Sequence, residues 1–260
     1  MRLKHASRWS ALVLLIAGVV GLAGLTMGTS YAADSAKVYF VQGLPGKNLD
    51  IAIDGKVVAK NVKTAAVVGP FTVKSGTRKV TFSDGGNVVL ERMFSVTPKS
   101  SWDVVVHLPA PGKTAPTLTA YENDLSAMPS DKANLTVAHT ATVPPADVTV
   151  NGKVLFSDIA NGEALSLVVP VGTYSTAIVP HDESSPVYLG PLKLTVKGGA
   201  LNRFYAVGDP EKKTMNVVLH VIDVPKSGSK KPKKVDTGTG GQAADLAAGE
   251  DPVLWVDLTR

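Results

Sequence analysis

Alternating apolar and polar positions run along most of the chain and predict β-strands. Residues 50–53 alternate as Asp-Ile-Ala-Ile, and Asp54–Gly55 then separates them from a second apolar run. Asp-Gly and Asn-Gly pairs favour two-residue hairpin turns, because both central residues of such a turn adopt positive φ. Turn signals recur every ~8–12 residues, as in β-sandwiches. Further β-rich runs are predicted at residues 79–82, 88–90, 102–108, 165–169, 174–179, 188–196 and 215–222.

The same pattern occurs twice. Residues 50–58 (DIAIDGKVV) are similar to residues 147–155 (DVTVNGKVL), and Gly76-Thr77 corresponds to Gly172-Thr173. A repeat of this length is a whole small domain. The sequence therefore predicts an all-β protein of two tandem Ig-like β-sandwiches. We place a divergent first repeat at residues 36–124, a linker at 125–132 and the second repeat at 133–224.

Residues 1–32 have the pattern of a secretory signal peptide. Three basic side chains lie within the first eight residues, an apolar run covers 11–25, and the small residues Ser30 and Ala32 follow. This order is typical of an export signal cleaved after Ala32. A retained membrane anchor is the alternative, but ~15 apolar residues fall short of the ~20 that span a bilayer. We expect a secreted, extracellular protein without an integral membrane span after cleavage.

Composition and charge then remove several classes of function. The chain of 260 residues contains no cysteine, which excludes disulfides, thiolate metal sites and cysteine nucleophiles. The formal net charge is +5, but three of the basic residues belong to residues 1–32. A mature chain with a net charge of about +2 gives little support for binding nucleic acid.

Residues 225–260 are predicted to form a disordered tail, because lysine, glycine and small residues dominate them. The lysines favour contact with anionic cell-wall polymers or a membrane surface, although a solubilising linker would have the same composition. The five residues assigned to this contact are Lys226, Lys230, Lys231, Lys233 and Lys234.

The tail ends in a short apolar stretch, residues 252–258 (PVLWVDL). Its central residues Leu254, Trp255 and Val256 are candidates for adding a strand to an exposed sheet edge, in this molecule or in a partner. A frayed terminus is the alternative.

The second repeat resembles a known protein family. His139, Asp158–Gly162 and Pro170–Tyr174 (PVGTY), together with residues 147–155, are similar to the family called domain of unknown function 4397. The resemblance covers residues 134–222 well and 37–121 more weakly, since the first copy has Lys74–Arg78 (KSGTR) in place of Pro-x-Gly-Thr-Tyr and Gln42 in place of His139. It implies an exported bacterial protein, often actinobacterial, with Ig-like domains. The function of the family is not established.

Two polar groups are the candidates for chemistry. His139, Asp147 and Ser157 could be assembled into a hydrolytic triad, but no G-x-S-x-G motif is present. His181-Asp182-Glu183 could contact calcium or zinc, but a solvated turn explains the same residues. His107 and His220 fall in different repeats. We expect no catalytic residue, cofactor or metal site, and we expect the His139 ring to bind backbone groups at the rim of its sandwich.

The favoured function is a non-enzymatic binding or spacer protein associated with the cell envelope. Its predicted partners are anionic envelope polymers, a membrane surface or another envelope protein. One alternative is an envelope hydrolase or metal-dependent enzyme that uses the region of His139 and His181. Another is a subunit that pairs with a partner through its C-terminal strand.

Overall fold

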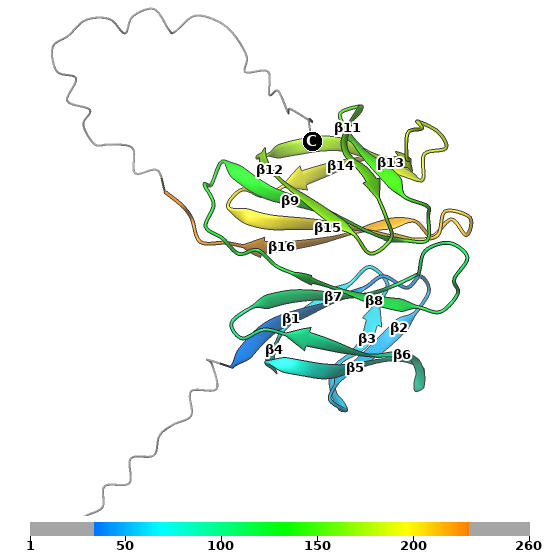
Figure 1. The fold of residues 1–260 in the computed structure, drawn as a ribbon, viewed down its shortest axis with the longest axis vertical. Coiled ribbons are helices and arrows are strands. Elements are labelled where there is room, and N and C mark those ends of the chain that lie inside the picture. The colour runs from blue at the N-terminus through cyan, green and yellow to red at the C-terminus, as the bar shows by residue number, and fades with distance from the viewer. Residues whose placement is uncertain (1–33, 229–260) are drawn as a thin grey trace, which may run out of the picture.

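The computed structural model describes residues 34–228 (Figure 1). The predicted signal peptide and most of the predicted tail therefore lie outside the described residues. Sixteen strands form the described part: β1 (Ser35–Gln42), β2 (Asn48–Ile53), β3 (Lys56–Lys63), β4 (Val67–Lys74), β5 (Gly76–Asp84), β6 (Asn87–Val96), β7 (Ser101–His107), β8 (Thr117–Glu122), β9 (Lys132–Ala141), β10 (Ala146–Val150), β11 (Lys153–Ile159), β12 (Ala164–Pro170), β13 (Gly172–Pro180), β14 (Leu189–Val196), β15 (Ala200–Gly208) and β16 (Asn216–Asp223).

The strands form four sheets in two sandwiches with the same topology. The first sandwich pairs the sheet β4-β1-β7-β8 with the sheet β3-β2-β5-β6. The second pairs β12-β9-β15-β16 with β11-β10-β13-β14, which is the same order displaced by eight strands. In both, the first strand runs parallel to the seventh, as β1 with β7 and β9 with β15. The predicted all-β fold of two tandem sandwiches is confirmed.

The predicted hairpins form where the sequence places them. Asp54 and Gly55 have φ of 48° and 81°, and the corresponding Asn151 and Gly152 have 50° and 81°. Glycine adopts this left-handed region readily because it has no Cβ, and the short side chains of asparagine and aspartate tolerate it because they can hydrogen-bond the nearby backbone. These turns join β2 to β3 and β10 to β11.

Each sandwich has its own apolar core, and the two cores place a central aromatic residue on different strands. In the first, Phe40 lies in register with Val104 and contacts Phe82, with ring centroids 5.9 Å apart. In the second, Val137 lies in register with Phe204. The aromatic ring thus moves from the first strand of the repeat to the seventh, which is the kind of compensating exchange that packed cores tolerate.

The two sandwiches pack through the outer faces of equivalent sheets. Figure 1 shows β1, β7 and β8 facing β9, β15 and β16 across the middle of the molecule. A buried apolar cluster fills this interface: Val41 and Val105 from the first sandwich, and Ala138, Tyr205, Val207 and Val218 from the second. Burial of both faces explains why all nine residues of β15 are buried. The sandwiches therefore form one body with a third, interdomain core.

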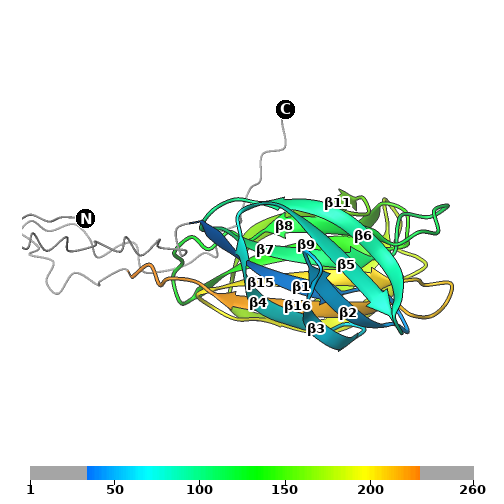
Figure 2. The same cartoon turned by 90° about the horizontal axis from the view of Figure 1, so that it is seen from below.

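Both described ends of the chain lie at the same end of this body, as Figures 1 and 2 show. The carbonyl of Asp34 accepts a hydrogen bond from the Ser75 amide (2.7 Å). Met128, in the connection between the sandwiches, binds the backbone of Pro225 and Ser227 with N–O distances of 2.9 and 3.0 Å. The β7–β8, β9–β10, β13–β14 and β15–β16 loops lie at the opposite end.

Candidate functional site

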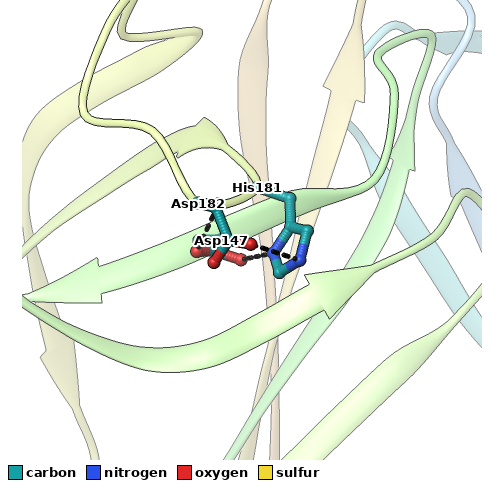
Figure 3. Close-up of side chains that lie close together, drawn as sticks. All are labelled: Asp147, His181 and Asp182. Carbon is teal, nitrogen blue, oxygen red and sulfur yellow. Dashed lines mark hydrogen bonds and ion pairs between the residues drawn. The ribbon is translucent and has the colours of Figure 1, made fainter.

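A polar cluster lies at the opposite end from the termini (Figure 3). Asp147 comes from β10, and His181 and Asp182 come from the loop after β13. The His181 ring lies between the two carboxylates, with Nδ1 2.9 Å from Asp147 Oδ1 and Nε2 3.2 Å from Asp182 Oδ2. The structure thus brings together two members of the predicted His181-Asp182-Glu183 trio and adds Asp147 in place of Glu183.

The structure brings together Asp147 and Ser157, two of the three residues of the triad considered from sequence. The Ser157 hydroxyl donates to Asp147 Oδ1 (3.0 Å) and lies 3.4 Å from His181 Nδ1. Serine hydrolases instead place the serine and the aspartate on opposite nitrogens of the imidazole, so that the ring can relay a proton. Here both groups contact Nδ1, and this arrangement does not activate the hydroxyl.

His139 belongs to neither group. It lies in β9 and is only 3% exposed, and among residues 34–228 neither ring nitrogen has a partner at full hydrogen-bond geometry. Burial lowers the pKa of His139, and weaker contacts with the backbone of His139 and of Pro144, in the β9–β10 loop, raise it but do not outweigh burial. The equivalent Gln42 instead binds the β1–β2 loop, donating to the carbonyls of Leu44 (3.1 Å) and Lys47 (3.0 Å). A glutamine amide carries a donor and an acceptor on a longer side chain, whereas the shorter imidazole does not reach the equivalent groups.

Asp147 also has a structural role that both repeats share. The Asp158 amide donates to Asp147 Oδ1 (2.8 Å), and in the first repeat the Asn61 amide donates to Asp50 Oδ1 at the same distance. Asp158 and Asn61 both have positive φ, at 55° and 52°. The carboxylate therefore fixes an irregular point in the neighbouring strand. Only the second repeat adds a histidine to it.

Asp147, His181 and Asp182 each offer a ligand atom within 4.8 Å of the others. Asp147 Oδ1 already accepts three hydrogen bonds, from Ser157, Asp158 and His181. A metal ion would compete with these donors. It would also displace the protons through which the two nitrogens of the His181 ring contact Asp147 and Asp182. The geometry suits a protonated histidine that fastens the β13–β14 loop.

The pKa values of the cluster agree with this reading. Burial raises the pKa of Asp147, but hydrogen bonds from Asp158, His181, Ser157 and Asp182 outweigh it and hold the value at about 2. The hydrogen bond to Asp147 raises the pKa of His181 above its usual 6.5, with a further contribution from the charge of Asp182. The ion pair is therefore complete between these two values and is lost as the pH rises through the pKa of His181.

We expect Asp147→Asn to lower the pKa of His181, because the substitution removes the carboxylate that binds Nδ1. NMR titration of the His181 ring proton measures this directly, with a value above 6.5 in the wild-type protein. Asp182→Asn is the matched control and should cause a smaller decrease, since Asp182 is highly exposed. Equal pKa values of His181 in the wild-type protein and in Asp147→Asn would contradict the ion pair between Asp147 and His181.

A second polar cluster is buried between the sandwiches. Asp103 is fully buried, and its Oδ2 lies 3.3 Å from Arg203 Nη1 and 2.9 Å from His220 Nδ1. The Tyr205 hydroxyl donates to the same oxygen, and Asn123 Nδ2 donates to Oδ1 (2.9 Å). Burial raises the pKa of Asp103, but His220, Arg203 and Tyr205 together hold it below its usual value.

This network joins equivalent positions of the two repeats. Asp103 lies in register with Tyr121, and Arg203 lies in register with His220. Asp103 contacts His220, the register partner of Arg203. The Arg203 guanidinium in turn lies 5.5 Å from the centre of the ring of Tyr121, the register partner of Asp103. The contact of Asp103 with Arg203 therefore lies near an approximate twofold axis. These groups hold the interface together rather than face solvent.

A cavity of about 660 Å³ opens at the loop end of the molecule. The first sandwich contributes Pro111 and Gly112 from the β7–β8 loop. The second contributes three loops: Thr142–Pro144, Pro186–Tyr188 and Asp209–Glu211. The contact of His181 with Asp147 fixes the start of the β13–β14 loop, and residues Pro186–Tyr188 at the end of the same loop line the cavity. The volume is within the range of small-molecule sites.

The sequence-predicted contact residues of the tail fall largely outside the described residues. Lys226 is described, is exposed, and pairs with Met128 in an isolated β-bridge. Lys230, Lys231, Lys233 and Lys234 lie beyond residue 228, as do Leu254, Trp255 and Val256. Within residues 34–228 we find no helix long and apolar enough to cross a membrane.

Comparison with known families agrees with the resemblance drawn from the sequence. Residues 36–146 match the model of a family described as Domain of unknown function (DUF4397). Residues 36–146 therefore belong to the DUF4397 family. The match covers the first sandwich, β9 and the first residue of β10, whereas the sequence motifs of the DUF4397 resemblance were clearest in the second repeat. No curated protein matches the chain.

The interdomain network was not predicted from the sequence. The available signal was a charged residue inside an apolar strand, Asp103 in SWDVVVH and Arg203 in ALNRFYAVG. Charged side chains are almost never fully buried without a partner. A charge in a strand that is apolar on both faces therefore indicates a paired site, although the sequence does not say which strand provides the partner.

Proposed function

We propose that this protein is a non-enzymatic binding or spacer module of the bacterial cell envelope. Its basic tail would contact anionic envelope polymers, and the loop end would face away from them. The observation that carries the proposal is the placement of the described ends. Asp34, the linker and Lys226 lie at one end of the body, whereas the 660 Å³ cavity lies at the other.

A spacer must hold its two ends in a fixed relative orientation, and the interface between the sandwiches supports this role. Two domains joined only by a linker would reorient freely. Here an apolar cluster and the buried Asp103–Arg203 pair fix one sandwich against the other. A tether at one end of the body would therefore determine where the cavity points.

The chemistry of the His181 cluster favours binding over hydrolysis. Ser157 and Asp147 contact the same ring nitrogen, and Asp147 is occupied in fixing the backbone of Asp158. The cluster holds a loop of the cavity in place, which is a positioning role. Loops at the ends of Ig-like sandwiches are the usual location of their binding sites.

Binding of the tail to envelope polymers should depend on salt. Five lysines near an anionic surface contribute ~1 kcal/mol each, and screening weakens them beyond a Debye length of ~8 Å at physiological salt. We expect protein bound to isolated cell walls at low salt to be released at high salt. A variant with all five lysines from Lys226 to Lys234 replaced by glutamine should bind weakly at both.

Lys56, Lys60 and Lys63 of β3 provide the control, since these lysines belong to the folded body. Their replacement by glutamine should leave retention on the cell walls unchanged. Equal retention of the wild-type protein at low and high salt would exclude the electrostatic contact.

A further inference from the structure

One edge of the second sandwich is open and carries no charge. Within the described residues, β12 is the outer strand of its sheet and pairs only with β9. Its seven residues, ALSLVVP, include no ionisable side chain. Natural edge strands are commonly protected by charged side chains, proline or bulges, because unpaired backbone groups attract another strand. β12 has none of these before its last residue, Pro170.

The residues exposed along β12 belong to the core side of the sheet. Leu165 lies opposite Val137, and Leu167 lies opposite Leu135, and both of these partners are buried in the core of the second sandwich. Opposite residues of an antiparallel pair point to the same face. Leu165 and Leu167 nevertheless remain 41% and 42% exposed. The core of the second sandwich is thus uncovered along this edge.

The equivalent edge of the first sandwich is protected. β4 contains Pro70, and its register with β1 shifts between Val38 and Phe40. Proline removes a backbone donor, and a shift in register bends the strand away from an incoming partner. Phe71, the counterpart of Leu167, packs against its core. The two repeats therefore differ in the one feature that controls strand addition.

We propose that residues 252–258 of this chain add to β12 as an additional strand and cover the open edge. The segment PVLWVDL carries one charge and provides apolar side chains of the size that the edge lacks, Trp255 above all. Strand addition of this kind gains main-chain hydrogen bonds along the edge and side-chain packing at alternate positions. The proposal is independent of what the protein binds in the envelope.

The chain leaves the body close to this edge. The Ser227 amide binds the Met128 carbonyl (3.0 Å), and the Val171 amide, next to the end of β12, binds the Asp131 carbonyl (3.1 Å). Met128 and Asp131 are three residues apart, which corresponds to at most about 11 Å. Residues 229–251 then provide a connection with a root-mean-square span of about 25 Å.

This connection reaches any part of β12, and it gives the segment an effective concentration of the order of millimolar. The attachment therefore favours the segment of the same chain over a second copy.

Trp255 provides the test. The protein is expressed from residue 33, which keeps every described residue, and Trp102→Phe leaves Trp255 as its only tryptophan. We expect blue-shifted Trp255 emission and weak quenching by acrylamide. Val256→Asp in the tail should shift the emission to that of free tryptophan without altering the sandwiches, and Leu167→Lys in β12 should do the same.

The matched control is Val88→Lys. Val88 is 61% exposed on β6, the edge strand of a sheet in the first sandwich, and this variant should leave Trp255 emission unchanged. Deletion of residues 251–260 should also increase amide hydrogen exchange in β12 at least tenfold while leaving β4 unchanged.

The outcomes separate the possible occupants of the edge. Protection of Trp255 and β12 that does not change with protein concentration supports docking within one chain. Protection that rises with concentration, together with a dimeric mass, overturns the proposal in favour of a second copy. Exposed Trp255 and unprotected β12 at all concentrations overturn it in favour of a different partner or an open edge.

Discussion

Replacing Asp103 by alanine is expected to lower the free energy of unfolding by about 3–5 kcal/mol, the cost of removing one partner from a buried ion pair. The substitution leaves Arg203, whose side chain is 6% exposed, without its carboxylate. Asn123 Oδ1 and the Glu122 carbonyl still accept hydrogen bonds from Arg203, but neither neutralises its charge. Tyr205 and His220 lose their shared acceptor at the same time.

Urea denaturation measures this loss. In protein expressed from residue 33 that carries Trp255→Phe, Trp102 is the only tryptophan and its fluorescence reports on the first sandwich, while far-UV circular dichroism reports on both. We expect one transition in the wild-type protein and two separated transitions in Asp103→Ala, since the interface is what couples the sandwiches. The control is Asp223→Ala, which removes a surface ion pair with Lys197 and should cost less than 1 kcal/mol. Equal losses for the two variants would contradict the role of the interface.

Mild acid should lower the free energy of unfolding by about 3 kcal/mol through His107 alone. This histidine of β7 is fully buried, and its Nδ1 donates to the Leu108 carbonyl (2.7 Å) while Nε2 contacts the Thr119 hydroxyl (2.9 Å). Burial lowers the pKa of His107 from 6.5 to about 4. Its neutral form therefore stabilises the fold fully above pH 6.5, and this stabilisation is lost as the pH falls from 6.5 towards 4.

The free energy of unfolding, measured in urea at intervals from pH 7 to pH 4, is expected to fall across this window. Burial also lowers the pKa of His139, which acts in the same direction. The aspartates with lowered pKa values, such as Asp103 and Asp147, stabilise the fold above their unfolded pKa of 3.8. Their stabilisation is lost only below that pH, so they do not account for a decrease between pH 7 and pH 4. His107→Gln should reduce the slope without removing hydrogen bonding at this position. An unchanged slope in that variant would show that His107 is not the titrating group.

The fold could be predicted because its signals are local. Asp54–Gly55 and Asn151–Gly152 specify hairpin turns through their own backbone preferences, and the similarity of residues 50–58 to residues 147–155 shows the duplication. Alternation along β2 and β10 then assigns which side chains face the core. None of these inferences needs knowledge of how distant parts of the chain meet.

The sites could not be predicted to the same degree, because they depend on contacts between distant strands. Asp103 and Arg203 are separated by 100 residues, and each has a register partner in its own sandwich. Asp147, Ser157 and His181 were all candidates from the sequence, but the predicted triad grouped Asp147 and Ser157 with His139. The spacing along the chain does not show whether His139 or His181 contacts Asp147. Only the fold shows that the β13–β14 loop returns to β10 and brings His181 to this carboxylate.

Asp103 and Arg203 occupy equivalent positions of the two repeats, and their contact would not form in a homodimer of single-repeat chains that associate through this face. In a homodimer with the same geometry, the residue at this position would face its own copy, so aspartate would meet aspartate and arginine would meet arginine. Like charges at such a distance repel, and burial leaves no solvent to screen them. Covalent fusion of the two halves removes this restriction, because each half can then carry the charge that the other lacks.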